Sequence, residues 1–374
     1  RGKNGPLHVE ALRKPHFLSS AFVNAAAQIG TPALEDYNGA SQEGASIVQV
    51  TQKRGWRQSA SKAFLKRALK RGNVSLITNA LVSGIVLEGK TARGITYKSD
   101  GSEKTINARR EVILSAGAIG SPQLLMLSGI GPAAHLKEQG IAVVQDLPGV
   151  GQNLQEHAGV WIVQEAFDGV HTMNLDYNAM GAIRHGLRDK EPSPDIQILF
   201  TPLGYKIEGQ EVKPMDTPAM MCIPTVCHPD SRGEIKLDQP IAEAAPLIMP
   251  KLLSDERDSA RLQAACEWVR DVFAAPAMKP YARAELFPGP ALQTQQQWYD
   301  HFRAAAGPVY HVTSTCKMGP GPEAVVDAAL RVKGIENLRV VDASIMPRIT
   351  SGNTNAPAMV IGAKAADLIL SDAA

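Results

Sequence analysis

The sequence predicts an α/β protein whose chain is shared between two domains, which can be interleaved. Its 374 residues exceed what a single ordinary hydrophobic core supports. Short β-branched segments bounded by turns alternate with segments that carry apolar residues at helical spacing, as in mixed α/β chains. The run "REVILSAG" (110–117) has the character of a buried strand, and its small residues lead directly into a helix-like segment.

The expected elements follow from these periodicities. Gly30 suits the end of the first helix, because glycine readily adopts the left-handed conformation that closes helices. Helices are expected over 16–30, 59–72, 256–275 and 356–370. Strands are expected over 74–89, 92–99, 110–115, 195–200, 233–238 and 337–344. The charged, Pro-rich stretch near 187–194 has two interpretations, a genuine loop or a join across missing residues.

Composition restricts the possible partners and compartments. Charged residues make up 20% of the chain and the net charge is +2, so neither nucleic acid nor an anionic membrane is expected as a partner. No apolar run approaches the roughly 18 residues that span a bilayer, so no transmembrane segment is expected. The cysteines form no CxxC pair and no metal-type cluster, which favours free buried thiols, no metal site and a cytoplasmic location. They are Cys222, Cys227, Cys266 and Cys316.

The run "GAIGSPQLLMLSGIG" (117–131) follows the strand at 110–115. Gly117 and Gly120 would let the backbone approach a ligand or another segment closely. Ser121 is a good N-cap, Pro122 suits a first helical turn, and Gly129 would end the helix. A strand followed by a capped helix N-terminus forms an edge that favours anions. The same residues are also compatible with a purely structural strand–turn–helix.

This run resembles the second signature of the glucose–methanol–choline (GMC) flavin oxidoreductases. The segments 146–157 ("DLPGVGQNLQEH"), 228–237 and 338–369 resemble other parts of that family. The sequence "RITSGNTNAP" (348–357) is similar to its choline and aliphatic-alcohol dehydrogenase branch. The resemblance implies a GMC-type FAD-binding domain and a substrate-binding domain with an antiparallel sheet.

The resemblance also implies how the chain is divided. Residues 1–71 would link the domains, and 158–305 would form the substrate-binding domain. Residues 72–157 and the C-terminal 306–374 would contribute to the FAD-binding domain, the latter with the active-site residues. The family's G-x-G-x-x-G fingerprint does not occur in the sequence. We therefore expect the N-terminal Rossmann portion to be absent here, and a missing N-terminal segment of the same protein to be a partner that completes the site.

The resemblance further implies the site residues. His311, in "VYHVTSTCKMG", falls at the position of the family's catalytic histidine, and Asn353 falls at its second polar position. A lone histidine in an apolar stretch can also be purely structural. Val312 and Ser314 depart from the residues common in the family, which leaves the fit of a substrate open. Residues expected to contact FAD are Val82, Tyr310, Asp342, Ala343, Thr354 and Asn355.

The function implied is FAD-dependent oxidation of the CH–OH group of a primary alcohol. A neutral imidazole can take the hydroxyl proton near neutral pH, while flavin N5 accepts the hydride. Oxygen, a quinone or an electron-transfer protein would then reoxidise the flavin. Two alternatives remain open at this point: a non-redox lyase of the hydroxynitrile type that holds FAD, and a non-catalytic fragment or interaction module without FAD.

Overall fold

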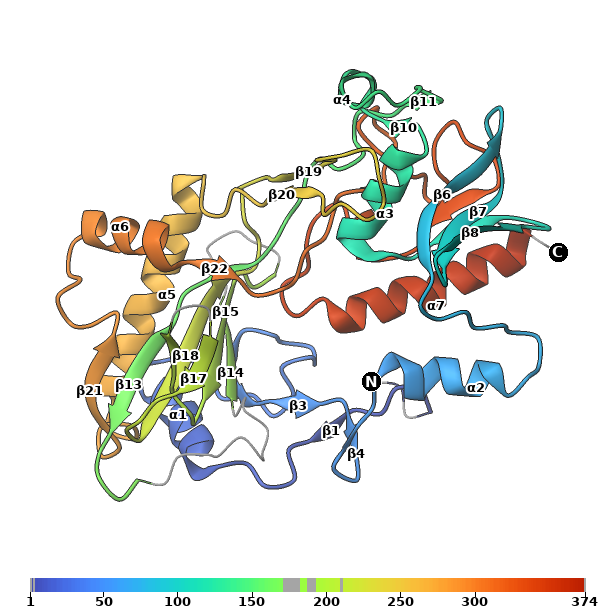
Figure 1. Ribbon diagram of the computed structural model, residues 1–374. Helices are drawn as coiled ribbons and strands as arrows, with labels where there is room; N and C mark the ends of the chain where they lie inside the picture. Colours follow the sequence, from blue (N-terminus) through green and yellow to red (C-terminus); the bar gives the residue numbers. More distant parts are fainter. Residues whose placement is uncertain (1, 3, 171–181, 187–192, 209–210, 373–374) are drawn as a thin grey trace. The chain divides into compact units, whose positions relative to one another are not determined.

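The computed structural model describes residues 2, 4–170, 182–186, 193–208 and 211–372 (Figure 1). The contacts within it divide the chain into two compact units. Unit 1 comprises 1–75, 158–228 and 255–307, and unit 2 comprises 76–157, 229–254 and 308–374. Each unit is thus assembled from three separate stretches of chain. The join considered near 187–194 lies mostly outside the described residues.

Unit 1 is built on an antiparallel sheet. Its strands run in the order β2, β14, β15, β18, β13 and β21, and every neighbouring pair is antiparallel. Residues Ile196–Thr201 of β15 are all buried, as expected of a central strand covered on both faces. The bounds are β2 (Gly44–Ile47), β12 (Ala158–Gly159), β13 (Ile162–Ala166), β14 (Ala182–Gly186), β15 (Ile196–Thr201), β18 (Ala219–Val226) and β21 (Ala282–Phe287).

Three helices accompany this sheet, and each begins at a polar cap. Both α1 (Phe17–Gln28) and α5 (Glu256–Ala274) contact its strands, while α6 (Gln295–Ala305) packs on α5. The His16 ring caps α1, and the Asp255 carboxylate caps α5 by accepting from the Arg257 N–H. A full capping box of Thr294 and Gln297 starts α6.

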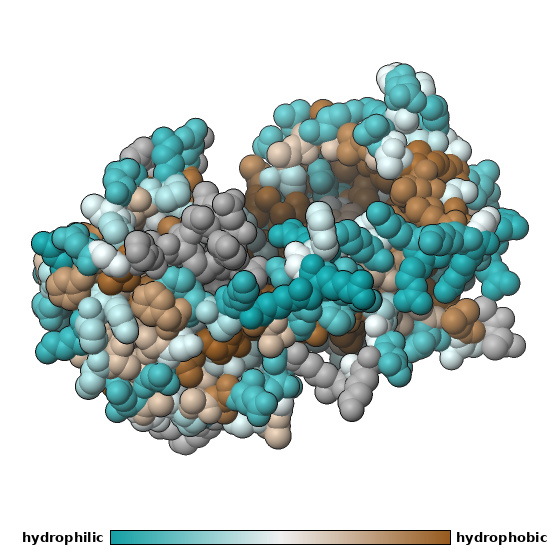
Figure 2. Space-filling view, turned by 90° about the horizontal axis from the view of Figure 1, so that it is seen from below, coloured by the Kyte–Doolittle hydropathy of each residue, from teal (hydrophilic) through white to brown (hydrophobic). Residues whose placement is uncertain are grey.

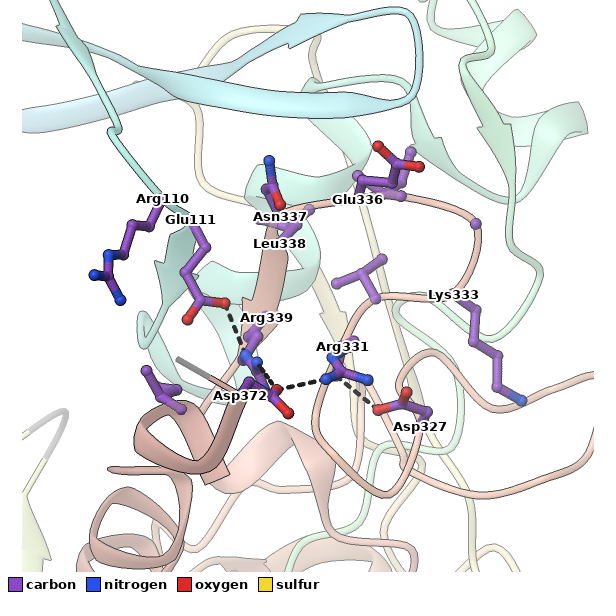
Figure 3. Close-up of a pocket in the computed structure, with 14 residues that line it drawn as sticks. Arg110, Glu111, Asp327, Arg331, Lys333, Glu336, Asn337, Leu338, Arg339 and Asp372 are labelled. Atoms are coloured by element: carbon purple, nitrogen blue, oxygen red, sulfur yellow. Dashed lines mark hydrogen bonds and ion pairs between the residues drawn. The ribbon is translucent and has the colours of Figure 1, made fainter. Parts of the chain in front are cut away.

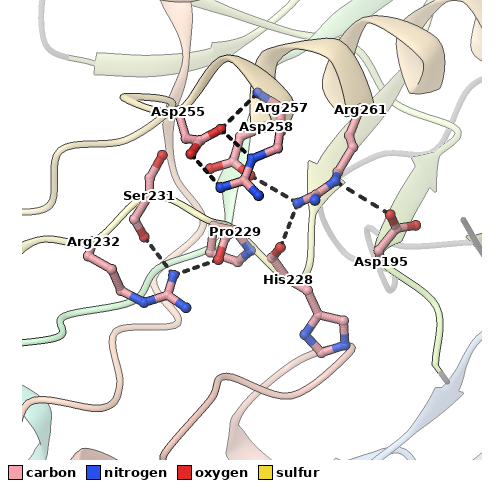
Figure 4. A network of polar contacts seen from close by, with 9 residues as sticks. All are labelled: Asp195, His228, Pro229, Ser231, Arg232, Asp255, Arg257, Asp258 and Arg261. Carbon is pink, nitrogen blue, oxygen red and sulfur yellow. Dashed lines mark hydrogen bonds and ion pairs between the residues drawn. The ribbon is translucent and has the colours of Figure 1, made fainter. Parts of the chain in front are cut away.

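A buried ionic network ties α5 to the sheet of unit 1 (Figure 4). The Arg261 guanidinium lies 3.1 Å from Asp258 and 3.7 Å from Asp195, and it donates to the His228 carbonyl at 2.8 Å. Both carboxylates and the guanidinium are nearly inaccessible to solvent. A buried charge of this kind needs its partners, so the network fixes where α5 sits on the strands.

Unit 2 combines an antiparallel sheet with a parallel strand pair. The sheet is β6 (Leu81–Glu88), β7 (Thr91–Ser99) and β8 (Ser102–Asn107), and β9 (Val112–Leu114) pairs in parallel with β23 (Leu338–Val340). The two long helices of this unit are α3 (Gly117–Leu127) and α7 (Asn355–Asp372). Since β9 and β23 are parallel, their carboxyl ends meet at one edge.

The hairpin of β19 (Glu234–Lys236) and β20 (Leu247–Met249) also belongs to unit 2. The Ile235 N–H donates to the Gly151 carbonyl at 2.7 Å, and the Gly233 N–H donates to the Leu154 carbonyl at 2.9 Å. These bonds join the hairpin to the segment before residue 158. Residues 229–254 are grouped with unit 2, whereas the sequence analysis had put them in a substrate-binding domain over 158–305. The division into a substrate-binding and an FAD-binding domain stays a prediction.

Shorter elements complete the described chain. Before β6 these are β1 (Glu10–Ala11), β3 (Gln49–Val50), β4 (Gln52–Lys53), β5 (Trp56–Arg57), η1 (Ser61–Leu65) and α2 (Lys66–Leu69). The others are β10 (Ile130–Gly131), α4 (Ala133–Glu138), β11 (Gln145–Asp146), β16 (Tyr205–Glu208), β17 (Glu211–Pro214), β22 (Gly307–Pro308) and η2 (Ala343–Ile345).

Most expected elements are present, with different bounds. In place of the helix expected over 59–72 there is a short π-helix, η1, followed by a single turn of α-helix, α2. The strand expected over 74–89 begins only at Leu81, and the preceding residues are exposed. None of the described helices is long and apolar enough to cross a membrane. Figure 2 shows hydrophilic and hydrophobic residues interspersed over one face.

The prediction of free buried thiols is confirmed. All four cysteines are buried and none forms a disulfide. Burial raises the pKa of each thiol, so all four stay protonated near neutral pH and are poor nucleophiles.

The start of α3 differs from the prediction. The helix begins at Gly117 rather than after Ser121, because the cap comes from a distant strand end. The Asp342 carboxylate accepts from the Gly117 N–H at 3.0 Å and from the Ser121 hydroxyl at 2.5 Å. Ser121 acts from inside the helix instead, where its oxygen accepts from the Ala116 N–H at 3.1 Å. The predicted end at Gly129, which has a φ of 78°, is confirmed.

Pro122 consequently lies within α3, where it has no N–H to donate to the Ala118 carbonyl four residues earlier. The Thr315 hydroxyl replaces that donor at 2.6 Å. Thr315 is fully buried and lies four residues after His311. A side chain from the C-terminal segment thus completes the hydrogen bonding of α3.

We expect Thr315→Val to lower the free energy of unfolding by about 1–3 kcal/mol, since it leaves a buried carbonyl without a donor. Urea denaturation would measure this loss. Thr315→Ser retains the hydroxyl and should cost less. Adding Pro122→Ala to Thr315→Val supplies a backbone N–H and should recover part of the loss. A double variant no more stable than Thr315→Val would contradict this account.

Candidate active site

The structure brings His311 and Asn353 together. The Asn353 Nδ2 atom lies 3.1 Å from His311 Nε2, although the residues are 42 positions apart. His311 lies on the loop after β22, and Asn353 lies just before α7. Asn353 is exposed and the backbone of Tyr310 is left-handed, with a φ of 66°. The pair therefore lies at the surface of unit 2, with Asn353 exposed and His311 partly buried.

A second histidine, which the sequence analysis missed, contacts the other side of the His311 ring. His157 Nδ1 lies 3.0 Å from His311 Nδ1, and the rings meet edge to face at 84°. The other nitrogen of His157, Nε2, lies 3.0 Å from the Thr350 carbonyl oxygen. The His157 side chain has no exposed surface. Three side chains, Asn353, His311 and His157, thus form a continuous line of hydrogen bonds.

Glu156 holds the backbone of the same loop and was also missed. Its two carboxylate oxygens accept from the His311 N–H at 2.8 and 2.9 Å. The side chain is 2% exposed, and this burial raises its pKa to about 7. Backbone N–H groups of His311, His157 and Val309 oppose the rise by stabilising the anion. A carboxyl group that changes charge near neutral pH is therefore hydrogen-bonded to the backbone of His311.

The signal that could have revealed these two residues is weak. Gln155, Glu156 and His157 are three consecutive polar residues immediately before an apolar strand, within the stretch that resembles the family. All three are nevertheless buried.

His311 is suited to act as a base. Burial lowers its pKa below the ordinary 6.5, so the imidazole is neutral near pH 7. A neutral ring has one nitrogen with a free electron pair that can accept a proton. The arrangement can therefore remove a proton from a hydroxyl group placed between His311 and Asn353.

The residues expected at the flavin lie on several elements. Asp342 and Ala343 follow β23, Thr354 is buried before α7, and Asn355 is the first residue of that helix. Tyr310 is 89% exposed beside His311. Val82 lies on β6, where it pairs with Tyr97, and no described contact brings it to His311. The cofactor contacts of all six residues stay predictions.

The meeting of β9 and β23 offers a place for a cofactor. Ligands of parallel sheets bind outside the carboxyl ends of the strands, where Gly117 and Asp342 lie here. Gly117 has a φ of 78°, and no atom of the described residues lies within 4 Å of the point that a Cβ would occupy. The space beside this turn is therefore open to a ligand.

A pocket of unit 2 is lined by charged side chains that neutralise one another (Figure 3). Arg339 is paired with Glu111 at 2.7 Å and with Asp372, and Arg331 also contacts Asp372. These pairs hold the end of α7 against the loop before β23. In the described part of the chain, no three His, Cys, Asp or Glu side chains cluster as a metal site.

Comparison with known families assigns the chain. The N-terminal model of the GMC oxidoreductases matches residues 3–159, and their C-terminal model matches residues 229–362. The chain belongs to the GMC oxidoreductase family. The sequence analysis expected the N-terminal Rossmann portion of the family to be absent. That expectation is not supported, because the N-terminal model aligns from residue 3.

Curated relatives of this GMC oxidoreductase include two kinds of choline dehydrogenase. The oxygen-dependent choline dehydrogenase of Brucella anthropi is 41% identical over 99% of this chain and 71% of its own length. The mitochondrial choline dehydrogenase of Homo sapiens is 40% identical over 99% of this chain and 66% of its own length.

Solved structures of similar fold include oxidases. A pyridoxine 4-oxidase from Mesorbium loti has a TM-score of 0.90 and 29% identity, covering 98% of this GMC oxidoreductase and 72% of that chain. A formate oxidase has a TM-score of 0.89 and 23% identity over 99% of this chain and 73% of its own, which shows the fold alone.

The raised pKa of Glu156 predicts a pH-dependent stability. Between its ordinary pKa of 4.5 and about 7, the folded state keeps a proton that the unfolded chain has released. Stability should therefore fall as pH rises through this window. Melting temperatures at pH 5, 6, 7 and 8 would show a smaller decline in Glu156→Gln than in the wild type. Glu234→Gln is a control and should retain the wild-type decline. An unchanged slope in Glu156→Gln would refute the assignment.

Proposed function

We propose that this GMC oxidoreductase uses FAD to oxidise the CH–OH group of a primary alcohol, with choline as the first candidate substrate. The observation that carries the proposal is the hydrogen-bonded line from Asn353 through His311 to His157. It presents a neutral base and an amide side by side at the surface of unit 2. The family membership and the choline dehydrogenases at about 40% identity support the cofactor and the substrate class.

The residues present are compatible with FAD. The open turn at Gly117 lies at the carboxyl edge of a parallel strand pair, next to the amino end of α3. In this proposal Val82, Tyr310, Asp342, Ala343, Thr354 and Asn355 hold the cofactor. When bound, FAD supplies the acceptor for the hydride that leaves the alcohol carbon.

The alcohol enters by replacing one hydrogen bond with two. Without substrate, His311 Nε2 accepts from the Asn353 amide at 3.1 Å. An incoming hydroxyl group donates its hydrogen to His311 Nε2, and its oxygen accepts from the Asn353 amide. As the carbon loses its hydride, the hydroxyl proton passes to Nε2 and a carbonyl group forms. Asn353 stabilises the negative charge that develops on oxygen without itself changing charge.

The substrate and the electron acceptor are separate parts of the proposal. Choline is proposed because of the relatives' activity and because "RITSGNTNAP" is similar to the choline branch. Oxygen, a quinone and an electron-transfer protein remain the candidates for reoxidising the flavin. The cytoplasmic location stays a prediction from the cysteines.

Anaerobic visible spectroscopy of the purified flavoprotein tests the function. Choline should bleach the flavin absorbance, and 3,3-dimethylbutan-1-ol, its uncharged isostere, shows whether the cationic group matters. We expect His311→Ala to slow the bleaching by about 10²–10⁴-fold, the usual contribution of general base catalysis. His301→Ala is the matched control, because the pKa of His301 on α6 is also lowered by burial.

The possible outcomes separate the alternatives. Full turnover in His311→Ala would refute the role of His311. Flavin that stays oxidised with every alcohol of a panel would instead favour the lyase. Protein that carries no flavin would favour the non-catalytic alternative.

The pH dependence gives a second test of His311 as the base. Its neutral form is required, so the rate of flavin reduction should rise with pH to a plateau, with a midpoint below 6.5 because the pKa of His311 is lowered. Asn353→Asp places a negative charge beside Nε2, which should raise the pKa of His311 and move the acidic limb to higher pH. Asn353→Ser removes the amide without adding charge and should lower the rate without that displacement. If the acidic limbs of the pH–rate profiles of Asn353→Asp and the wild type coincide, His311 is not the base.

A further inference from the structure

The His157–His311 contact determines which nitrogen of each ring carries a hydrogen. The Thr350 carbonyl can only accept, so His157 Nε2, at 3.0 Å, must carry a hydrogen and donate it. The His157 ring has no exposed surface, which favours its neutral form with a single hydrogen. Its Nδ1 atom is therefore an acceptor.

The same reasoning then fixes His311. Because His157 Nδ1 accepts, the His311 Nδ1 atom 3.0 Å away must carry the hydrogen of that bond. In the neutral ring His311 Nε2 is then unprotonated and accepts from the Asn353 amide. The Thr350 carbonyl thus sets, through two rings, the protonation of the nitrogen that faces Asn353.

We propose that His157 is a positioning residue that holds His311 in the tautomer whose Nε2 is free to accept the alcohol proton. This inference rests on the proposed function and adds a residue to it. His157 touches neither the alcohol nor the flavin in this proposal. It acts by accepting from His311 Nδ1 before and after the proton arrives at Nε2. Once His311 is positively charged, that hydrogen bond becomes charge-assisted and stronger.

The surrounding backbone supports this role, because the segment 155–157 holds both loops that carry the reacting groups. The Gln155 amide oxygen accepts from the Ile349 N–H, and its nitrogen donates to the Pro347 carbonyl, both at 3.2 Å. The Gln155 backbone also bonds in both directions with Thr313, at 3.0 and 3.2 Å. Glu156 holds the His311 N–H. The backbones that carry His157 and His311 therefore cannot separate without breaking several of these bonds.

Two variants distinguish positioning from proton acceptance. Glutamine offers one acceptor and one donor on a planar amide, so His157→Gln can serve both His311 and Thr350 but cannot take a proton. Leucine is of similar size and offers neither group, so in His157→Leu only Asn353, among the described residues, still hydrogen-bonds to the His311 ring, and its amide can turn to present either its NH₂ group or its oxygen to Nε2. The ring nitrogens of His311 can be observed by NMR in protein with ¹⁵N-labelled histidine. Their signals are assigned by their loss in His311→Asn.

We expect the wild type and His157→Gln to show one His311 tautomer, protonated at Nδ1. His157→Leu should show a mixture of tautomers. Its limiting rate of flavin reduction by choline should fall about 10–100-fold, as for other residues that orient a reacting side chain. The dissociation constant of choline should change much less, because His157 does not touch the substrate.

A single Nδ1-protonated tautomer in His157→Leu would overturn the proposal. A loss of rate in His157→Gln equal to that in His157→Leu would also overturn it, since the ring would then be needed to accept a proton. If His157→Leu does not fold, mixed tautomers in His157→Gln serve as the contradicting result. The ring spectra need no substrate. If the wild type shows the expected His311 tautomer but no alcohol reduces its flavin, the proposed function is refuted and the inference about the tautomer is not.

Discussion

The site depends on one buried polar segment, Gln155–His157. Each of its side chains makes hydrogen bonds to residues more than 150 positions later in the chain. Buried polar groups are costly unless they are satisfied, so these contacts hold the loops at 309–313 and 347–350 in one arrangement. The position of His311 relative to Asn353 follows from that arrangement, as does the direction of the hydrogen bonds between their side chains. The loop that carries the proposed base is thus fixed by residues from another part of unit 2.

The same burial sets the electrostatics. It lowers the pKa of His311 and raises that of Glu156, so both groups favour their neutral forms. A neutral imidazole is the form that can take a proton. Because the His311 ring is partly buried, water solvates a newly formed imidazolium poorly. Fixed dipoles and hydrogen-bond acceptors such as the His157 ring therefore have to stabilise its positive charge.

Local sequence patterns predicted the elements better than they predicted the contacts. The helices near 17–28 and 256–274 could be predicted because caps and apolar spacing are local properties. The start of α3 could not, since its cap is Asp342, 225 residues away. His311 and Asn353 were predicted through resemblance to a family, and the structure places their side chains 3.1 Å apart. Glu156 and His157 were missed because a polar run before a strand gives no local sign that it will be buried.

The contact between Asn353 and His311 has a consequence for recognition. Because each group already satisfies the other, the alcohol's hydroxyl group competes with a partner that the protein itself provides. The hydroxyl group forms two hydrogen bonds in the site, but the bond between Asn353 and His311 is broken and the hydroxyl group gives up its own bonds to water, so the net gain in free energy is small. The hydroxyl group therefore determines how a bound molecule is oriented, while the remainder of the molecule must supply most of the affinity. Selectivity among alcohols should accordingly be decided away from the reacting carbon.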